Sequence, residues 1–579
     1  MTQRPKGQTF LEGAAILTAA TLLVKVIGAL FKIPLANILG GVGMSYFVTA
    51  YDLFTPIYSL AVTGLSVAVS RMVAEHTARG SDAGVQAVMR ASRRIFLCAG
   101  VVGFGLMLAA APQFVKLVNN PASLFSVAAI APAVLFSCIS AIYRGYYQGL
   151  SDMVPTAISQ VIEAVARLVF GILFAYGVTA LMLARYAQTG QLLGISFPNA
   201  EYAKLFILRF SAAGAIFGVT LSTAAGALYI RLRFVHTRQL LVVQSDYHLN
   251  RETGRRLVKI AVPIALSTLV VNLSSLIDLA SVMNCLHSAI EQDGQTILQM
   301  YQGSIPPELN LDLLPEYLYG SYSGLAHSIF NLIPAITAGL GISAIPAVSR
   351  AWAHDNKQNL EQTISSILRL TMLVALPAGL GLAVLAKPIL LFLYPARVME
   401  VTIVAPILRV MGFCAVLVAA ASPMNSILQS IGKERLPLII LLMGAAVKLI
   451  TNLTLVPRPE INIQGVPYGT LLCYGVIVLL SGAALRICSG VNPGFWRTFF
   501  KPFLCAAGSS IAAGGCYQLL ATGLPQAGNA LPLLLSIACA VAVYVFLTLF
   551  TGTICKNDLK MLPLSEKVLK RLEKLGFIS

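Results

Sequence analysis

The chain has 579 residues, of which 57% are hydrophobic and only 11% are charged, and its formal net charge is +18. The mean hydropathy of +0.79 is that of a chain that buries its apolar surface in lipid, which excludes an ordinary soluble globular protein. No loop between the apolar segments is long enough to form a separate soluble domain.

Apolar segments, each close to the roughly 20 residues that cross a bilayer as a helix, recur from Phe10 to Thr551. The first stretch exceeds the apolar core of a signal peptide, so we expect it to be retained. The sequence therefore predicts an all-α integral membrane protein with about 14 transmembrane helices. The predicted spans are 11–36, 46–69, 95–115, 122–143, 154–180, 206–230, 258–284, 322–347, 364–386, 403–427, 436–456, 464–485, 502–523 and 530–551.

Basic residues are distributed unevenly between successive loops. The connection at 231–259 has seven Lys or Arg, whereas 286–320 has five acidic residues and none that are basic. Because basic loops stay on the cytoplasmic side, we expect 286–320 outside and both termini in the cytoplasm. The positive charge is thus explained by topology and by the tail after 552, which would lie against anionic headgroups. A nucleic-acid partner is not expected.

The chain also repeats itself weakly. Ala68–Arg71 matches Ala347–Arg350, and Gln148 and Arg167 correspond to Gln429 and Lys448 at nearly the same spacing. Six helices per repeat predict two parallel lobes related by a pseudo-two-fold axis along the membrane normal. The expected parts are an N-terminal lobe at 1–230, a basic cytoplasmic connection at 231–256, a C-terminal lobe at 257–487 with its outer loop at 286–320, two extra helices at 488–552 and a basic tail at 553–579.

Two lysines fall within the first predicted helix. Lys25 lies at its middle, and Lys32 follows two turns later on the same face. A charge inside the bilayer is costly, so each lysine is a candidate for function. Together they would form a basic ladder for an anionic group such as a diphosphate. Alternatively, the Lys32 ammonium reaches water at the outer membrane interface, and Lys25 forms a structural pair with another group of the protein.

Acidic and amide side chains fall in the second and seventh predicted helices. Asp52 and Asp278 are expected at similar height, and Asp278 follows a polar stretch that begins at Asn272. The two carboxylates could pair with basic neighbours such as Lys32, bind a coupling Na⁺ or H⁺, or lie exposed. Asn272 is a further candidate for substrate binding.

The fifth and eleventh helices carry corresponding cations. Glu163 and Arg167 are four residues apart, so they meet on one face as a neutralising pair or as an ion pair within a cavity. Lys448 corresponds to Arg167 but has Gly444 in place of the acid. It therefore needs another partner, such as Asn452 or a substrate phosphate.

Three arginines, Arg71, Arg144 and Arg350, are expected to end their helices at the cytoplasmic face. There they would complement the helix dipole or receive an anionic headgroup. Ten cysteines are scattered singly, without the spacing of a metal site, and we expect them to pack as small apolar residues. The sequence has no Walker A motif and no hydrolase motif, so we expect neither a cofactor nor an enzyme activity.

Several short motifs resemble a known family. They are KVIGALFKIPLANILG at 25–40, GLSVAVSR at 64–71, KLITNLTLVP at 448–457 and IQGVPYGT at 463–470. These are similar to the polysaccharide-transporter branch of the multidrug/oligosaccharidyl-lipid/polysaccharide exporter superfamily. Within it, the chain most resembles the stage V sporulation protein B group and its relatives, which include proposed lipid II flippases.

The resemblance implies a monomeric alternating-access transporter of the bacterial plasma membrane. It would flip an anionic lipid-linked oligosaccharide, such as lipid II or a related cell-wall precursor, to the outer leaflet, with basic residues of the first helix contacting the headgroup. Membrane lipids and a coupling Na⁺ or H⁺ would be the other partners. One alternative is a cation-coupled multidrug antiporter of the same superfamily, for which acidic cavity residues are expected. A membrane lipid–sugar ligase is the least favoured alternative.

Overall fold

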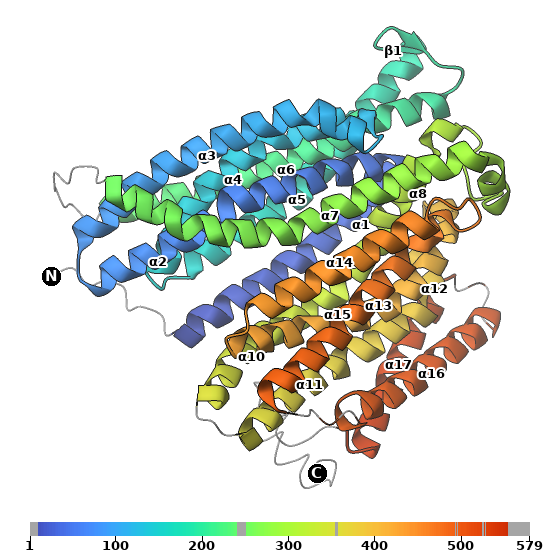
Figure 1. Ribbon diagram of the computed structural model, residues 1–579. Helices are drawn as coiled ribbons and strands as arrows, with labels where there is room; N and C mark the ends of the chain where they lie inside the picture. Colours follow the sequence, from blue (N-terminus) through green and yellow to red (C-terminus); the bar gives the residue numbers. More distant parts are fainter. Residues whose placement is uncertain are drawn as a thin grey trace. The chain divides into compact units, whose positions relative to one another are not determined.

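The computed structural model is helical almost throughout (Figure 1), and it describes residues 10–239, 251–353, 357–491, 494, 496–523, 526 and 528–553. The all-α prediction is confirmed. In the described residues the strands are β1 (Gln191–Leu192) and β2 (Ile195–Ser196), which pair antiparallel in a small hairpin. The centre of the basic connection, 240–250, and the tail from 554 lie outside the described residues, and their expected roles stay predictions.

The chain divides into two compact units. The first comprises Met1–His287 and Pro307–Gly324, and the second comprises Ser288–Pro306 and Leu325–Ser579. The first unit therefore holds most of the helix that the repeat assigns to the C-terminal lobe. The compact units are defined by contacts within the structure, whereas the lobes are expected from the sequence repeat. The expected lobes therefore remain a prediction.

The first unit is built from long helices that pack pairwise, with α5 on α6, α4 on α6, α3 on α4 and α1 on α5. Its elements are α1 (Phe10–Tyr58), η1 (Ser59–Thr63), α2 (Gly64–Ala78), α3 (Asp82–Leu117), η2 (Pro121–Ser123), α4 (Leu124–Gly149), α5 (Val154–Thr189), α6 (Ala200–Gln239), most of α7 (Arg251–Met300), η3 (Leu311–Leu313), α8 (Leu314–Ser321) and the start of η4 (Tyr322–Ala326).

Gly40 divides α1 into two helical pieces. Its φ of 60° and ψ of −170° interrupt the helix in a region that is open essentially to glycine alone. The 49 residues of α1 would extend about 70 Å as a single helix, more than twice the hydrocarbon thickness of a bilayer. The first two predicted spans, 11–36 and 46–69, therefore lie in one helical segment that is interrupted at Gly40.

The expected outer loop 286–320 is partly helical, which corrects the sequence-based prediction. Helix α7 continues to Met300, and α8 begins at Leu314. Asp293 interrupts α7 and restarts it, because its carboxylate accepts hydrogen bonds from the Thr296 hydroxyl and backbone N–H. These bonds hold the pKa of Asp293 below its ordinary value.

In the second unit, α13 packs on α10, α11 and α15, and the helices α16 and α17 pack on each other. Helix α16 also packs on α11, which attaches the C-terminal pair to the rest of the unit. The elements are α9 (His327–Phe330), α10 (Leu332–Ala353), α11 (Lys357–Val384), α12 (Ala386–Leu393), α13 (Val398–Ser430), α14 (Arg435–Leu455), η5 (Asn462–Gly465), α15 (Val466–Ser489), η6 (Trp496–Phe500), α16 (Lys501–Gly523) and α17 (Ala530–Phe550).

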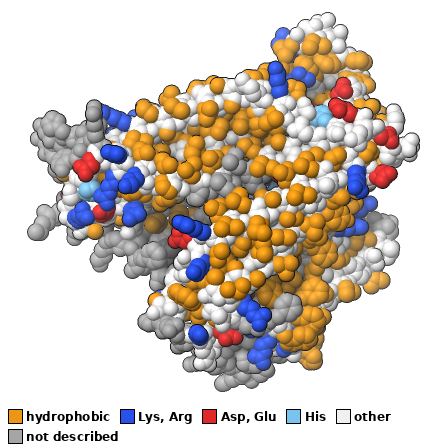
Figure 2. All heavy atoms as spheres, viewed as in Figure 1, with side chains coloured by type: hydrophobic (Ala, Val, Ile, Leu, Met, Phe, Trp, Pro, Cys, Tyr) orange, Lys and Arg blue, Asp and Glu red, His pale blue; other side chains and the backbone are white. Residues whose placement is uncertain are grey.

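Eleven helical segments among the described residues are long and apolar enough to cross a membrane. The first of them, Ile16–Ala78, contains the Gly40 break and so covers two predicted spans. The count of fourteen stays a prediction. On the first unit, apolar side chains cover the middle of the helices, and Lys and Arg gather at the end where α2 and α3 meet (Figure 2). This distribution is expected of a multi-pass membrane protein.

Candidate functional site

The lysines of the predicted ladder differ in their surroundings. Lys25 is exposed on α1, whereas Lys32, two turns later, is half-buried. Lys32 lies close enough to Asp52 and Arg167 for their charges to interact. The first unit therefore brings together a cation of the first predicted helix, an acid of the second and a cation of the fifth.

One carboxylate on α5 binds two arginines. Arg167 donates from Nη2 to Oε1 of Glu163 at 3.1 Å, and Arg144 on α4 donates from Nη2 to Oε2 at 2.9 Å. The three side chains are between 14% and 23% exposed, so their charges are largely removed from water. Arg144 also donates from Nε to the Ser159 hydroxyl at 3.0 Å, and Arg167 reaches the Tyr51 hydroxyl at 3.4 Å.

This arrangement corrects the prediction for Arg144. We expected Arg144 to end its helix and bind the last carbonyls, but it binds Glu163 and Ser159 on α5. Pairing with a carboxylate satisfies a poorly exposed guanidinium better than backbone carbonyls do. The predicted pair of Glu163 and Arg167 forms as expected, yet it does not neutralise the site, since a second arginine shares the acid. Arg71 is exposed on α2.

Asp52 and Asp278 lie close enough for their charges to interact, and the Tyr319 ring on α8 is near both. Each aspartate is half-buried. The interaction of two like charges is unfavourable, and a bound cation or proton would relieve it. The two aspartates that the sequence predicted at similar height therefore lie near each other, and their role in binding a coupling ion stays a prediction.

The Asn272 side chain is engaged with protein groups. Its amide donates to the Ser59 hydroxyl at 2.6 Å and to the Thr268 carbonyl at 2.9 Å. Ser59 begins η1, a π-helical turn of the second predicted span. Such turns are common at functional positions and leave backbone groups to be satisfied by neighbours. Asn272 therefore ties α7 to this turn in the first unit.

Lys448 and Asn452 belong to the second unit, so the structure does not join them to the cluster in the first. Both lie on α14 and face Gly469 of α15. Asn452 is almost fully buried and Lys448 is half-buried. In the same unit, Gln464 of the motif at 463–470 donates from Nε2 to the Tyr301 hydroxyl at 3.5 Å.

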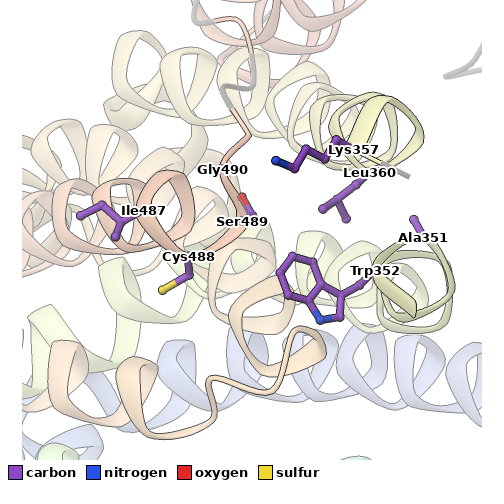
Figure 3. Close-up of a pocket in the computed structure, with 8 residues that line it drawn as sticks. All are labelled: Ala351, Trp352, Lys357, Leu360, Ile487, Cys488, Ser489 and Gly490. Carbon is purple, nitrogen blue, oxygen red and sulfur yellow. The ribbon is translucent and has the colours of Figure 1, made fainter. Parts of the chain in front are cut away.

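A shallow pocket of about 310 Å³ in the second unit lies between the ends of α10 and α15 and the start of α11 (Figure 3). Its lining includes Trp352, Lys357 and Ser489. The Ser489 hydroxyl already donates to the Leu485 carbonyl at 2.6 Å. The pocket contains none of the predicted site residues. Among the described residues, no cluster of His, Cys, Asp or Glu has the arrangement of a metal site.

Sequence reasoning missed Arg144 and Tyr51 as members of the charged cluster. Arg144 lies in a helix that its sequence neighbours mark as apolar, and its distance from Glu163 in the chain gives no signal of contact. Arg144 follows directly after the predicted span 122–143, and the structure extends its helix to Gly149, which the sequence did not indicate.

Comparisons with known proteins show several similarities. The family model described as "Polysaccharide biosynthesis protein" matches residues 10–289, and the MatE model matches residues 322–454. The chain is 24% identical to Stage V sporulation protein B of Bacillus subtilis over 97% of this chain and 99% of the relative. It is 23% identical to Lipid II flippase MurJ of Bacillus subtilis over 81% and 82%, respectively.

Solved structures show the same fold. The inward closed conformation of Lipid II flippase MurJ matches with a TM-score of 0.58 at 14% identity, covering 93% of this chain and 98% of that one. The inward-facing conformation of a MATE family multidrug resistance transporter matches with a TM-score of 0.57 at 16% identity, covering 83% and 99%. These relatives are transporters and flippases rather than enzymes.

Proposed function

We propose that this chain, a membrane transporter that belongs to the multidrug/oligosaccharidyl-lipid/polysaccharide exporter superfamily, flips an anionic lipid-linked oligosaccharide. The substrate would be lipid II or a related cell-wall precursor, moved from the inner to the outer leaflet of a bacterial plasma membrane. Similarity to relatives named as a lipid II flippase and a sporulation protein supports this proposal.

A cluster of basic side chains in the first unit carries the proposal. Three basic side chains, Lys32, Arg144 and Arg167, face two carboxylates, those of Asp52 and Glu163. Asp278 adds a third carboxylate beside Asp52, and Lys25 lies two turns before Lys32 on the same helix. In surroundings of low dielectric constant closely spaced basic side chains attract an anion, and a diphosphate is the anionic part of a polyprenyl-linked sugar.

In the proposed mechanism, Lys25 receives the diphosphate and Lys32 takes it over two turns further along α1. A lysine suits this transfer because its ammonium is a mobile point charge. The Glu163 carboxylate keeps the two arginines in place between transport cycles. The polyprenyl tail stays in the lipid while two parallel lobes rock about the midplane, and Lys448 and Arg71 bind the headgroup at other stages.

The remaining features of the proposal follow from the charge pattern. Both termini are cytoplasmic, and the resemblance implies that the transporter acts as a monomer. Asp52 and Asp278 bind the coupling Na⁺ or H⁺, which would relieve the interaction between their charges. The opposite proposal, a cation-coupled drug antiporter, is supported by the MatE match at 322–454. Such a carrier needs a predominantly anionic site, whereas the cluster in the first unit contains three basic side chains.

Complementation tests the proposal in cells. The full chain is expressed in a bacterium depleted of its essential lipid II flippase, beside the Lys25→Ala variant and an exposed control, Lys204→Ala. We expect the chain and the control to restore growth and Lys25→Ala to fail. Resistance to cationic drugs without restored growth would favour the antiporter instead.

A further inference from the structure

Glu316 is a buried carboxylic acid that the proposed transport path does not use. It lies in the first turn of α8 and is only 4% exposed. Its Oε2 atom has no hydrogen-bond partner, and no Lys, Arg or His forms an ion pair with it among the residues that the structure describes. The desolvation of an ionised carboxylate in such a place costs free energy, and protonation of the group removes that cost.

Glu316 lies one helical turn before the closest approach of α8 to α1. At that point Gly320 faces the Gly41 carbonyl, and a Cβ atom at Gly320 would overlap that oxygen. A Cβ at Gly41 would meet the Tyr317 carbonyl at 2.6 Å. The two backbones therefore touch through small residues, as membrane helices commonly do. The Glu316 side chain, one turn before this contact, is itself only 4% exposed to water.

The surrounding titratable groups do not neutralise Glu316. The Tyr46 hydroxyl of α1 interacts electrostatically with Glu316. Arg209 of α6 interacts electrostatically with Tyr46 but forms no ion pair with Glu316. Asp312 of η3 is exposed and adds a like charge. The carboxylates of Asp52 and Asp278 act on Tyr319, one turn further along α8.

The electrostatics agree with this geometry. Glu316 precedes the predicted eighth span and lies outside the eleven apolar segments. Burial, aided by the charge of Asp312, raises the pKa of Glu316 to about 7. Because the pKa is raised, protonation of Glu316 stabilises the packed helices, and this stabilisation is complete when the pH is below the ordinary pKa of glutamate. The stabilisation is lost as the pH rises through the raised value.

We propose that Glu316 is a proton-binding site that couples protonation to the contact between α8 and α1. The acid is protonated while Gly320 packs on Gly41, and it releases its proton when the helices separate and water reaches the carboxylate. This inference goes beyond the proposed flipping activity, because it identifies an ion-binding residue and does not depend on which substrate is carried.

Infrared titration of the full-length protein in lipid nanodiscs tests proton binding directly. The wild type minus Glu316→Gln difference spectrum should contain a protonated carboxyl band that disappears with a midpoint near pH 7. The matched control Asp312→Asn should keep the band and lower its midpoint, since a like charge is removed. A difference spectrum that loses the band near the ordinary pKa of glutamate, or that keeps it throughout to about pH 9, would overturn the proposal.

A second measurement tests the coupling to helix separation. Ser321→Cys places a thiol beside Gly41, in a background without native cysteines, and its labelling rate is divided by that of an exposed Gln302→Cys reference. The relative rate should rise several-fold as the pH increases through neutrality and stay low in the Glu316→Gln protein. An unchanged pH response in Glu316→Gln would contradict the coupling. No transport substrate is present, so failure here is distinguishable from failure of the proposed function.

Discussion

Arg144 on α4 and Arg167 on α5 bind different oxygens of the same carboxylate, that of Glu163, at 2.9 and 3.1 Å. One acid thus holds two cations from two helices, so these three side chains together carry one positive charge. This relationship predicts that Glu163 stabilises the protein by holding both arginines.

Removing the shared acid should destabilise the protein more than removing either arginine. Glu163→Gln leaves two poorly exposed guanidinium groups without a counter-ion, and we expect a loss of about 3 kcal/mol in unfolding free energy. Arg144→Gln leaves the acid paired with Arg167, so its effect should be smaller. Thermal unfolding in nanodiscs compares the variants. Equal transition temperatures for Glu163→Gln and the wild type would show that the acid is not the counter-ion of both arginines.

The close approach of α1 and α8 predicts a sharp steric effect. Gly320→Ala places a methyl group on the Gly41 carbonyl, and because two backbones must separate, we expect a cost of about 3 kcal/mol or more. Gly381→Ala is the matched control, since nothing lies within 4 Å of its added Cβ. Unfolding temperature and monodispersity after purification report the difference. A Gly320→Ala protein as stable as Gly381→Ala would contradict the observed helix crossing.

The basic ladder predicts graded effects on transport. Lys25→Ala should reduce flipping at least about tenfold, because a charge-assisted contact contributes roughly 1.5–3 kcal/mol. Lys25→Arg should retain part of the activity, since its charge remains but its shape differs. Initial flipping rates at equal protein insertion measure the series. Full activity in Lys25→Gln would show that the lysine has a structural role.

Topology gives a further prediction. Single cysteines in 231–239 and after 553 should react only with reagents that reach the cytoplasm, and cysteines in 290–310 only with reagents added outside. The reason is the asymmetry of seven basic residues against none in successive connections. Labelling of 231–239 and 290–310 from the same side would contradict the fourteen-span arrangement.

Sequence reasoning predicted the helical fold well, because apolar length and loop charge act locally and are visible in any stretch of about 20 residues. It also predicted the Glu163–Arg167 pair, since both residues lie on one helix face. It could not predict the contact of Arg144 with Glu163, or the burial of Glu316 against α1. Those depend on how separate helices cross, and small residues such as Gly41 and Gly320 permit a crossing without marking its partner.

Reconstituted flipping tests the central claim most directly. The purified chain is placed in vesicles with fluorescent lipid II in both leaflets, and the fraction protected from an external quencher is followed over time. We expect the chain and Lys204→Ala to exchange the lipid between leaflets, and Lys25→Ala to do so at least about tenfold more slowly. Exchange no faster than in protein-free vesicles, while the chain transports cationic drugs into the same vesicles, would contradict the claim.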